Sequence, residues 1–216
     1  MDEPILAIEG ALGTFSAAVL DGERLVASGL DGRDALERGL GNVRDVLREA
    51  NLSLDRLRGI AVGIGPGGFT GLRIAVAFAK SLAYGASLPL VGVSSFDILD
   101  AAAQAEELFP RLTVVFGRTG VVCVRRSERS ACRVACGPID TTIARLLPAD
   151  APLTIVGATE DVRSAVLERA TSVHFVSCAP ELPAATLARI ARLRVPAPSV
   201  HAIAPDYGEV PAVNVK

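Results

Sequence analysis

The chain has 216 residues, of which 50% are hydrophobic, and a formal net charge of −2 at pH 7. That composition is sufficient for one large domain or two small lobes with packed cores, and it excludes an intrinsically disordered chain. The 22 lysines and arginines are spread along the chain and form no basic run that would bind nucleic acid independently. The acidic start at 1–4 leads directly into a predicted strand, and no segment is apolar enough to span a membrane, so we expect a cytoplasmic protein.

The first half of the chain alternates short apolar runs with segments of helical periodicity. Asp21-Gly22 predicts a hairpin turn between two strands. Apolar residues three and four positions apart, from Leu36 to Ala50, predict a helix with one apolar and one charged face. The predicted order is strands at 5–8, 15–20 and 24–28, a helix at 33–50, a strand at 60–64, a helix from 69 to about 86, a strand at 90–93 and a helix at 96–107 that is capped by Ser95.

The second half repeats this order of elements, although its sequence does not visibly repeat the first. It predicts strands at 112–116, 121–126 and 133–136, a helix at 141–147, a strand at 153–156, a helix at 160–170, a strand at 173–176 and a helix at 183–194. We therefore expect a first lobe at 1–107 and a smaller second lobe with a tail at 108–216. The tail after Pro196 is rich in Pro and Ala and is expected to be irregular.

A glycine-rich turn, Gly65-Pro66-Gly67-Gly68, separates the strand at 60–64 from the helix that follows it. Pro66 has no N–H to continue a ladder, and we expect Gly67 to adopt a backbone conformation open mainly to glycine. Gly63 to Gly68 matches the spacing of a dinucleotide-binding fingerprint, but a proline lies inside it and no acidic residue follows about 20 residues later. A phosphate-binding P-loop would need a Gly-Lys-Ser/Thr ending, which is missing. A purely structural turn is the third interpretation.

The helix after this turn has an apolar arc of about 200°, wider than the roughly 100° that contact with its own sheet requires. A second apolar surface, from this chain or from another, is therefore expected to cover the remainder. Ala75, Ala79 and Ala83 recur every four residues within the arc, which would let a second helix approach closely.

The cysteines and histidines predict neither disulfides nor a metal site. Cys132 and Cys136 would face the same side of one strand about 13 Å apart, which is beyond disulfide reach, and we expect the four cysteines to be reduced. His174 and His201 have no histidine or cysteine neighbour at ligand spacing.

The sequence around the glycine turn resembles a family signature. Residues 65–74 read GPGGFTGLRI, and AKSLA at 79–83 and PLVGVSS at 89–95 follow. This region resembles the GPGSFTGLRIG signature of the TsaB (YeaZ) family, accessory subunits in the synthesis of threonylcarbamoyladenosine on tRNA that belong to the actin-like ATPase superfamily. The resemblance implies an α/β fold of two ribonuclease-H-like lobes, each a mixed five-stranded sheet with helices (the ASKHA fold). The residues that we assign to a structural turn are Gly65, Pro66, Gly67, Gly68, Thr70 and Gly71.

Several positions depart from the family pattern. Gly68 stands where the family usually has Ser, and Glu9-Gly10-Ala11 stands where it has Asp-Thr-Ser, so hydroxyl groups are lost from the hairpin that holds phosphate and metal in the superfamily. One carboxylate is a poor magnesium site. Residues 115–122 resemble the family's ARRGEVY turn, of which this chain retains Arg118 and Gly120. Residues 205–209 stand where the family tends to have Tyr-Leu-Arg, of which only Tyr207 is retained. We expect no catalytic residue, no metal and no cofactor.

The resemblance implies a non-catalytic subunit that forms a heterodimer with TsaD, the transferase that carries an HxxxH metal motif, and activates it. TsaE would join this complex with ATP, tRNA would bind only through the complex, and the chain alone would form a homodimer. Two alternatives remain open. One is a small-molecule kinase or ATPase of the same superfamily, and the other is a self-associating structural protein.

In the family, two helices of the first lobe form the dimer surface. The residues of this chain that we therefore expect at a partner interface are Leu72, Arg73, Val76, Ala79, Lys80 and Ala83, together with Leu36 and Leu40 of the preceding helix. An unpaired charge in such a contact is costly, so we expect Val76→Arg to leave the monomer folded and to abolish association.

Overall fold

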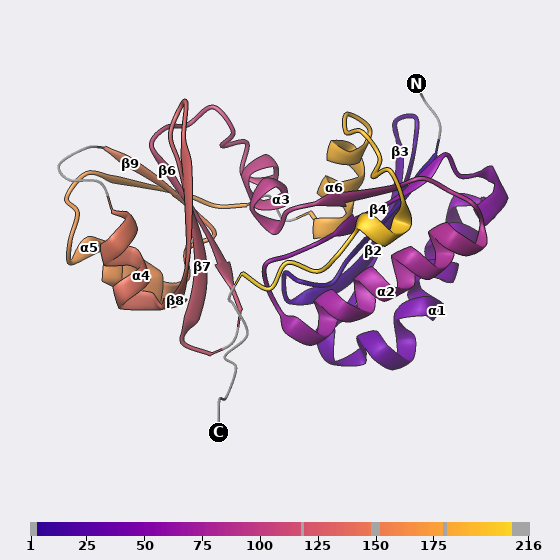
Figure 1. The fold of residues 1–216 in the computed structure, drawn as a ribbon, viewed down its shortest axis with the longest axis horizontal. Coiled ribbons are helices and arrows are strands. Elements are labelled where there is room, and N and C mark those ends of the chain that lie inside the picture. Colours follow the sequence, from indigo (N-terminus) through magenta and orange to yellow (C-terminus); the bar gives the residue numbers. More distant parts are fainter. Residues whose placement is uncertain (1–3, 118, 148–151, 179–180, 209–216) are drawn as a thin grey trace.

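Two five-stranded mixed sheets form two lobes that lie side by side (Figure 1). The computed structural model describes residues 4–117, 119–147, 152–178 and 181–208. Arg118 and Glu209, from the two segments compared with the family at 115–122 and 205–209, lie outside the described residues. The first sheet has the order β3-β2-β1-β4-β5 and the second the order β10-β9-β6-β7-β8. The predicted α/β fold with a mixed five-stranded sheet in each lobe is confirmed.

Parallel pairing in the first sheet brings three strand ends to one edge. Its strands are β1 (Ile5–Glu9), β2 (Thr14–Asp21), β3 (Arg24–Asp31), β4 (Gly59–Gly63) and β5 (Leu90–Val93). β4 runs parallel to both β1 and β5, whereas β2 runs antiparallel to β1 and β3. The carboxyl ends of β1, β4 and β5 therefore meet, which is where α/β folds commonly place their sites.

Helices cover both faces of this sheet (Figure 1). α1 (Ala35–Ala50) and α2 (Phe69–Gly85) pack on the face that carries Leu6 and Ile8 of β1. Ala7, which lies between those two residues, faces the opposite way into a second cluster with α6 (Pro183–Ala191). Side chains alternate along a strand, so an apolar run such as 5–8 indicates a strand buried on both faces.

The second sheet is covered by helices on its outer face. It consists of β6 (Arg111–Phe116), β7 (Val121–Ser127), β8 (Cys132–Pro138), β9 (Leu153–Val156) and β10 (Val173–Val176). α4 (Ile139–Leu146) and α5 (Glu160–Leu167) share a core cluster with it. α3 (Ser95–Ala102) lies between the two sheets, and its cap is Ser94 rather than the predicted Ser95, because the Ser94 hydroxyl accepts a hydrogen bond from Phe96 N–H at 3.2 Å.

The helix predicted at 183–194 in the second lobe packs on the first sheet instead. As α6, it buries Ala184 and Leu187 against β1 and β2, and Ala184 N–H donates to Ser16 Oγ at 3.1 Å. The tail stays with the first lobe, where Ala197 N–H donates to the carbonyl of Leu90. Between 192 and 208 the tail has only a 3-10 turn at Val200–Ala202, so its predicted irregularity is confirmed. The division at 107/108 stays a prediction.

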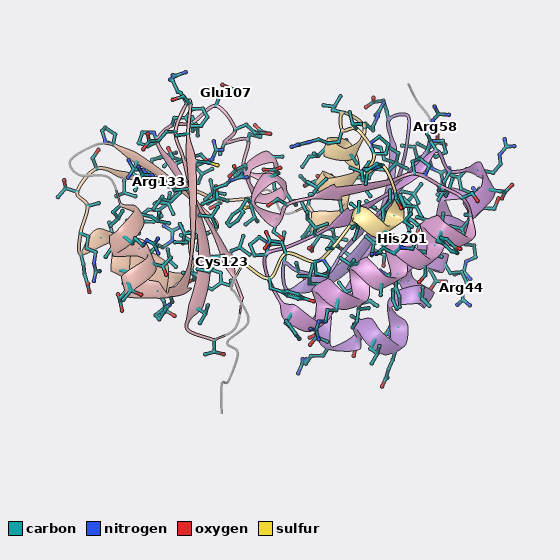
Figure 2. The ribbon with its side chains drawn as sticks, viewed as in Figure 1. Arg44, Arg58, Glu107, Cys123, Arg133 and His201 are labelled. Carbon is teal, nitrogen blue, oxygen red and sulfur yellow. A yellow bond between two sulfur atoms is a disulfide. The ribbon has the colours of Figure 1, made fainter. Side chains whose placement is uncertain are left out.

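The expectation that the four cysteines are reduced is wrong for two of them. Cys123 on β7 and Cys136 on β8 are directly opposed in the antiparallel register and form a disulfide. Figure 2 places Cys123 where the second lobe faces the first. Cys132 and Cys178 are free thiols, as predicted. The spacing within one strand excludes a bond between Cys132 and Cys136, but it does not show which residue the neighbouring strand brings opposite each of them.

Candidate functional site

The glycine turn packs closely against backbone atoms from other parts of this chain. Gly67 has a φ of +152°, and a Cβ at this position would collide with the carbonyl of Ala11. The next residue, Gly68, donates its N–H to the same carbonyl at 2.7 Å. The turn therefore lies directly on the β1–β2 hairpin, and the prediction that Gly67 needs a conformation open mainly to glycine is confirmed.

Close backbone approach also explains the glycines on either side of the turn. A Cβ on Gly71, in the first turn of α2, would collide with the carbonyl of Gly10, and the reverse is also true. Gly65 has a φ of +94° and leaves room for the carbonyl of Asp206 in the tail. Its own carbonyl accepts a hydrogen bond from Ser95 N–H at 2.7 Å. Four separate segments thus meet at the end of β4.

A cavity between the two lobes has a volume of about 330 Å³. It lies beside the ends of β6 and β9 and the β1–β2 hairpin. Its lining consists of Ala11, Leu12, Gly13, Gly68, Leu99, Val114, Val115, Phe116, Gly117, Gly157 and Pro183. None of these described residues has a charged or hydroxyl-bearing side chain, so the wall supplies apolar groups and backbone.

Glu9 lies behind this hairpin and is fully buried. Its Oε1 accepts a hydrogen bond from Ala11 N–H at 2.7 Å and its Oε2 one from Leu12 N–H at 3.3 Å. Burial raises the pKa of Glu9 to about 7, against the opposing effect of these backbone hydrogen bonds. The carboxyl group therefore takes up two N–H donors of the hairpin and does not face the cavity.

The superfamily fold implies a nucleotide with its metal at this hairpin, and the residues present do not fit one. The Glu9 carboxyl is enclosed, and Gly10 and Ala11 offer no hydroxyl. Among the described residues, no group of three or more His, Cys, Asp or Glu side chains is placed to hold a metal ion.

Four of the predicted interface residues are core residues. Leu72, Val76, Ala79 and Ala83 are buried within this chain, so the prediction that they meet a partner is wrong. The apolar arc of α2 packs in one cluster with α1 and with Ile203 of the tail. The second apolar surface that the wide arc requires thus comes from this chain.

The other four predicted interface residues remain at the surface. Leu36 and Leu40 on α1 are 71% and 51% exposed, and Arg73 on α2 is also exposed. Lys80 is half-buried and donates to the carbonyl of Ile203 at 2.7 Å. Beside Leu40 lies an open groove of about 550 Å³, lined by Leu40, Val43, Arg44, Leu47, Arg48, Leu52, Ser53, Leu54 and Leu82.

Phe69 is a surface residue that the sequence analysis did not select. The Arg73 guanidinium lies 3.7 Å from the centre of its ring, and Arg73 Nε donates to the hydroxyl of Tyr207 at 2.9 Å. Phe69 and Arg73 lie in the GPGGFTGLRI signature, and Tyr207 is the tail residue that matches the family pattern. These matches were the only sequence signal that could have linked the three residues. The pair lies at the first turn of α2, next to the glycine turn.

A comparison with protein families identifies the relatives of this chain. The family model described as TsaD: tRNA N6-adenosine threonylcarbamoyltransferase matches residues 32–177, which is more than half of the chain. The chain belongs to the TsaD family.

Among individual proteins, this chain is similar to curated TsaB proteins. The tRNA threonylcarbamoyladenosine biosynthesis protein TsaB of Escherichia coli (strain K12) is 41% identical over 92 residues, covering 42% of this chain and 40% of that protein. The TsaB of Haemophilus influenzae is 35% identical over 102 residues, covering 47% and 42%. This chain thus matches less than half the length of either curated relative.

A solved structure matches nearly the whole chain. YeaZ from Pseudomonas aeruginosa has a TM-score of 0.72 and 26% sequence identity, with 95% of this chain and 99% of that chain covered. The resemblance to TsaB (YeaZ) and the actin-like ATPase fold are therefore confirmed. Among the described residues of this TsaD-family chain, no helix combines the length and the apolar character that crossing a membrane requires.

Glu9→Gln is expected to weaken the dependence of stability on pH. Since the pKa of Glu9 is raised from 4.5 to about 7, the folded protein holds this proton more tightly than the unfolded chain does. The proton on Glu9 therefore stabilises the folded state fully below pH 4.5, and this contribution is lost as the pH rises through about 7. The free energy of unfolding should fall by roughly 3 kcal/mol over that range. Urea denaturation across this pH range would measure it, and a variant that keeps the wild-type pH dependence would contradict the assignment to Glu9.

Proposed function

We propose that this chain is a non-catalytic subunit for the threonylcarbamoyladenosine modification of tRNA, and that it acts by binding and activating a TsaD-type transferase. The names of the TsaB relatives support the pathway. In this proposal TsaE joins the complex with ATP, tRNA binds only through the complex, and the isolated chain forms a homodimer.

The exposed apolar face of α1 is the observation that carries the proposal. Leu36 and Leu40 are four positions apart, which places them one above the other on the helix, and both are more than half exposed. The apolar groove beside Leu40 extends this face toward Leu54 and Leu82. Contiguous exposed apolar surface of this kind marks protein interaction sites, and these residues offer it on the outer side of the first lobe.

The inter-lobe cavity supports the non-catalytic part of the proposal. Phosphoryl transfer depends on positioned charge around the phosphates and their metal. The described lining offers apolar side chains and glycines, and Glu9 is enclosed behind it. The chain is therefore better suited to holding a partner than to hydrolysing a nucleotide.

Leu40→Arg is expected to weaken binding to the TsaD protein of the same organism by at least about tenfold, because the docked surface would have to bury a charge. Isothermal titration calorimetry would measure this affinity, and modification of unmodified tRNA by the reconstituted proteins would measure activation. Leu167→Arg is the matched control, since Leu167 is an exposed leucine on α5 of the other lobe.

Two different results would count against the proposal. Wild-type binding by Leu40→Arg would exclude the α1 surface as the interface. A wild-type chain that neither binds the transferase nor changes its activity would exclude the function.

A further inference from the structure

The last described residue of the tail lies against the disulfide of the second lobe. In Figure 1 the tail leaves the 3-10 turn at Val200–Ala202 and runs toward β7 and β8. A Cβ on Gly208 would collide with the Sγ atoms of both Cys123 and Cys136, and it would lie 3.1 Å from Cβ of Pro66 in the glycine turn. Gly208 therefore fills the space between the disulfide and the first lobe.

The disulfide is also packed against the core where the two lobes meet. Cys123 is buried and shares a cluster with Phe96 of α3 and Val115 of β6. Leu12, from the β1–β2 hairpin of the first lobe, packs against the same cluster. Because protein interiors are close-packed, a change in the volume of the sulfur pair must displace one of its neighbours.

The end of the tail connects the disulfide to the signature segment of the first lobe. Asp206 N–H donates to the carbonyl of Ile64 at 2.6 Å, directly before the glycine turn. The Tyr207 hydroxyl accepts a hydrogen bond from Arg73 Nε at 2.9 Å, and the ring centres of Tyr207 and Phe69 are 5.1 Å apart. Phe69, Arg73 and Tyr207 together form what we call the Arg73 cluster. Its tail member directly precedes the residue that touches the sulfurs.

Reduction of the disulfide would enlarge the sulfur pair, and the tail is the neighbour that can give way. Each sulfur gains a hydrogen, and the two sulfurs move apart from bonding distance to van der Waals contact. Gly208 is exposed, and its N–H is bonded within the tail, to Asp206 Oδ1 at 2.8 Å. Phe96 and Val115 are buried core residues, which are more costly to move than an exposed tail.

We propose that the Cys123–Cys136 disulfide is a reversible redox-modification site, and that its reduction by a dithiol releases the end of the tail and separates the Arg73 cluster. Cys136 is half-buried whereas Cys123 is buried, so a thiolate of the dithiol attacks Cys136 Sγ. The S–S bond breaks, a mixed disulfide forms at Cys136, and Cys123 leaves as a thiolate that takes up a proton.

The second thiol of the reductant completes the exchange. It attacks its own sulfur in the mixed disulfide, and Cys136 leaves as a thiolate and takes up the second proton. The dithiol is oxidised to a cyclic disulfide, so its two electrons and two protons pass to the two cysteines of the protein.

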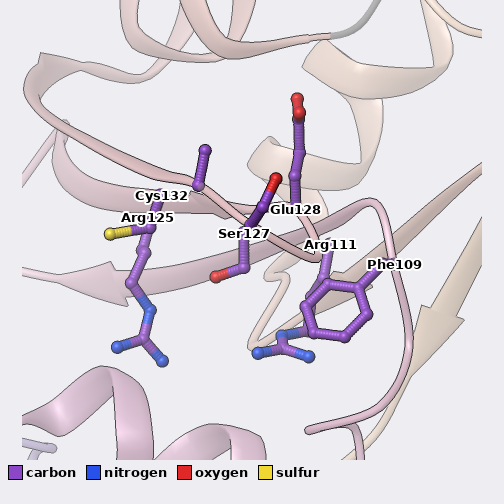
Figure 3. Close-up of a pocket in the computed structure, with 8 residues that line it drawn as sticks. Phe109, Arg111, Arg125, Ser127, Glu128 and Cys132 are labelled. Atoms are coloured by element: carbon purple, nitrogen blue, oxygen red, sulfur yellow. The ribbon is translucent and has the colours of Figure 1, made fainter.

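Counting thiols by alkylation and mass spectrometry measures this chemistry, with dithiothreitol as the dithiol. Alkylation of the unfolded, oxidised protein is expected to label two of the four cysteines, Cys132 and Cys178. Incubation of the folded protein with dithiothreitol should raise the count to four, and oxidised dithiothreitol should restore two. Cys132 is exposed and lines the open pocket in Figure 3, so its labelling in the folded protein should be the same in both states.

Hydrogen–deuterium exchange of the tail measures the structural consequence. The Asp206 amide is expected to exchange about tenfold faster after reduction, because its hydrogen bond to Ile64 opens more often in a released tail. Cys136→Ser should exchange at the rate of the reduced wild type with and without dithiothreitol. Cys132→Ser is the matched control, since it removes an exposed free thiol of the same strand, and it should respond to dithiothreitol as the wild type does.

Gly208→Ala provides a second variant should Cys136→Ser fail to fold by circular dichroism. Its methyl group would collide with both sulfurs, so the tail should exchange fast while the disulfide is still intact. Equal exchange of the Asp206 amide in the oxidised and reduced wild type would overturn the proposal. So would a disulfide that dithiothreitol reduces only in the unfolded protein. These assays use the isolated chain without a partner, so their outcome is independent of the proposed function.

Discussion

Val76→Arg is expected to unfold the protein rather than to separate folded subunits. Val76 is 3% exposed and belongs to the core cluster that joins α2, α1 and the first sheet. A charged guanidinium placed there would lose its hydration without gaining an ion partner, at a cost of several kcal/mol. A domain of this kind has a net stability of only about 5–15 kcal/mol, so one such substitution removes a large part of it.

Circular dichroism and the urea midpoint of the purified variant would measure this effect. Ala77→Arg is the matched control, since Ala77 is the next residue on the same helix and is exposed. It should have the wild-type spectrum and midpoint. A folded, monomeric Val76→Arg would restore the interpretation of Val76 as an interface residue and contradict the packing of α2 described above.

Asp100→Asn is expected to lower the free energy of unfolding by about 3–5 kcal/mol, the range for removing one partner of a buried ion pair. Asp100 is buried on α3, and its carboxylate binds Arg111, Arg125 and the Thr113 hydroxyl. An amide of similar size leaves two largely buried cations without that anion. Because α3 lies between the sheets, the loss should also loosen the contact of α3 with β6 and β7.

Urea denaturation at neutral pH would measure the change. The control is Asp45→Asn, which removes an exposed carboxylate that lies near Arg44 and Arg48 on α1. Water screens exposed pairs strongly, so the midpoint of this variant should stay close to that of the wild type. Equal, small changes in both variants would show that the Asp100 network contributes little to stability.

Periodicity predicted which side chains of one element share a face, but it left open what covers that face. The apolar arc of α2 was wide enough to require two contacts, and the sequence allowed the second to be this chain or a partner. The structure shows α1 and Ile203 of the tail in that place. Leu36 and Leu40 lie on the same predicted apolar face as Val43 and Leu47, yet they stay exposed, because no segment of the described chain covers them.

Local chemistry by itself determined the strands, the helices and the glycine turn of this protein. An uninterrupted apolar run indicated the buried strand at 5–8, and Gly67 could be predicted because its requirement for a positive φ arises within a few residues of chain. The pairing of Cys123 with Cys136, the docking of α6 on the first sheet and the Asp100 network were decided only by the tertiary structure. Each of these contacts depends on the register or path of segments that are separate in sequence, and no local period of the chain carries that information.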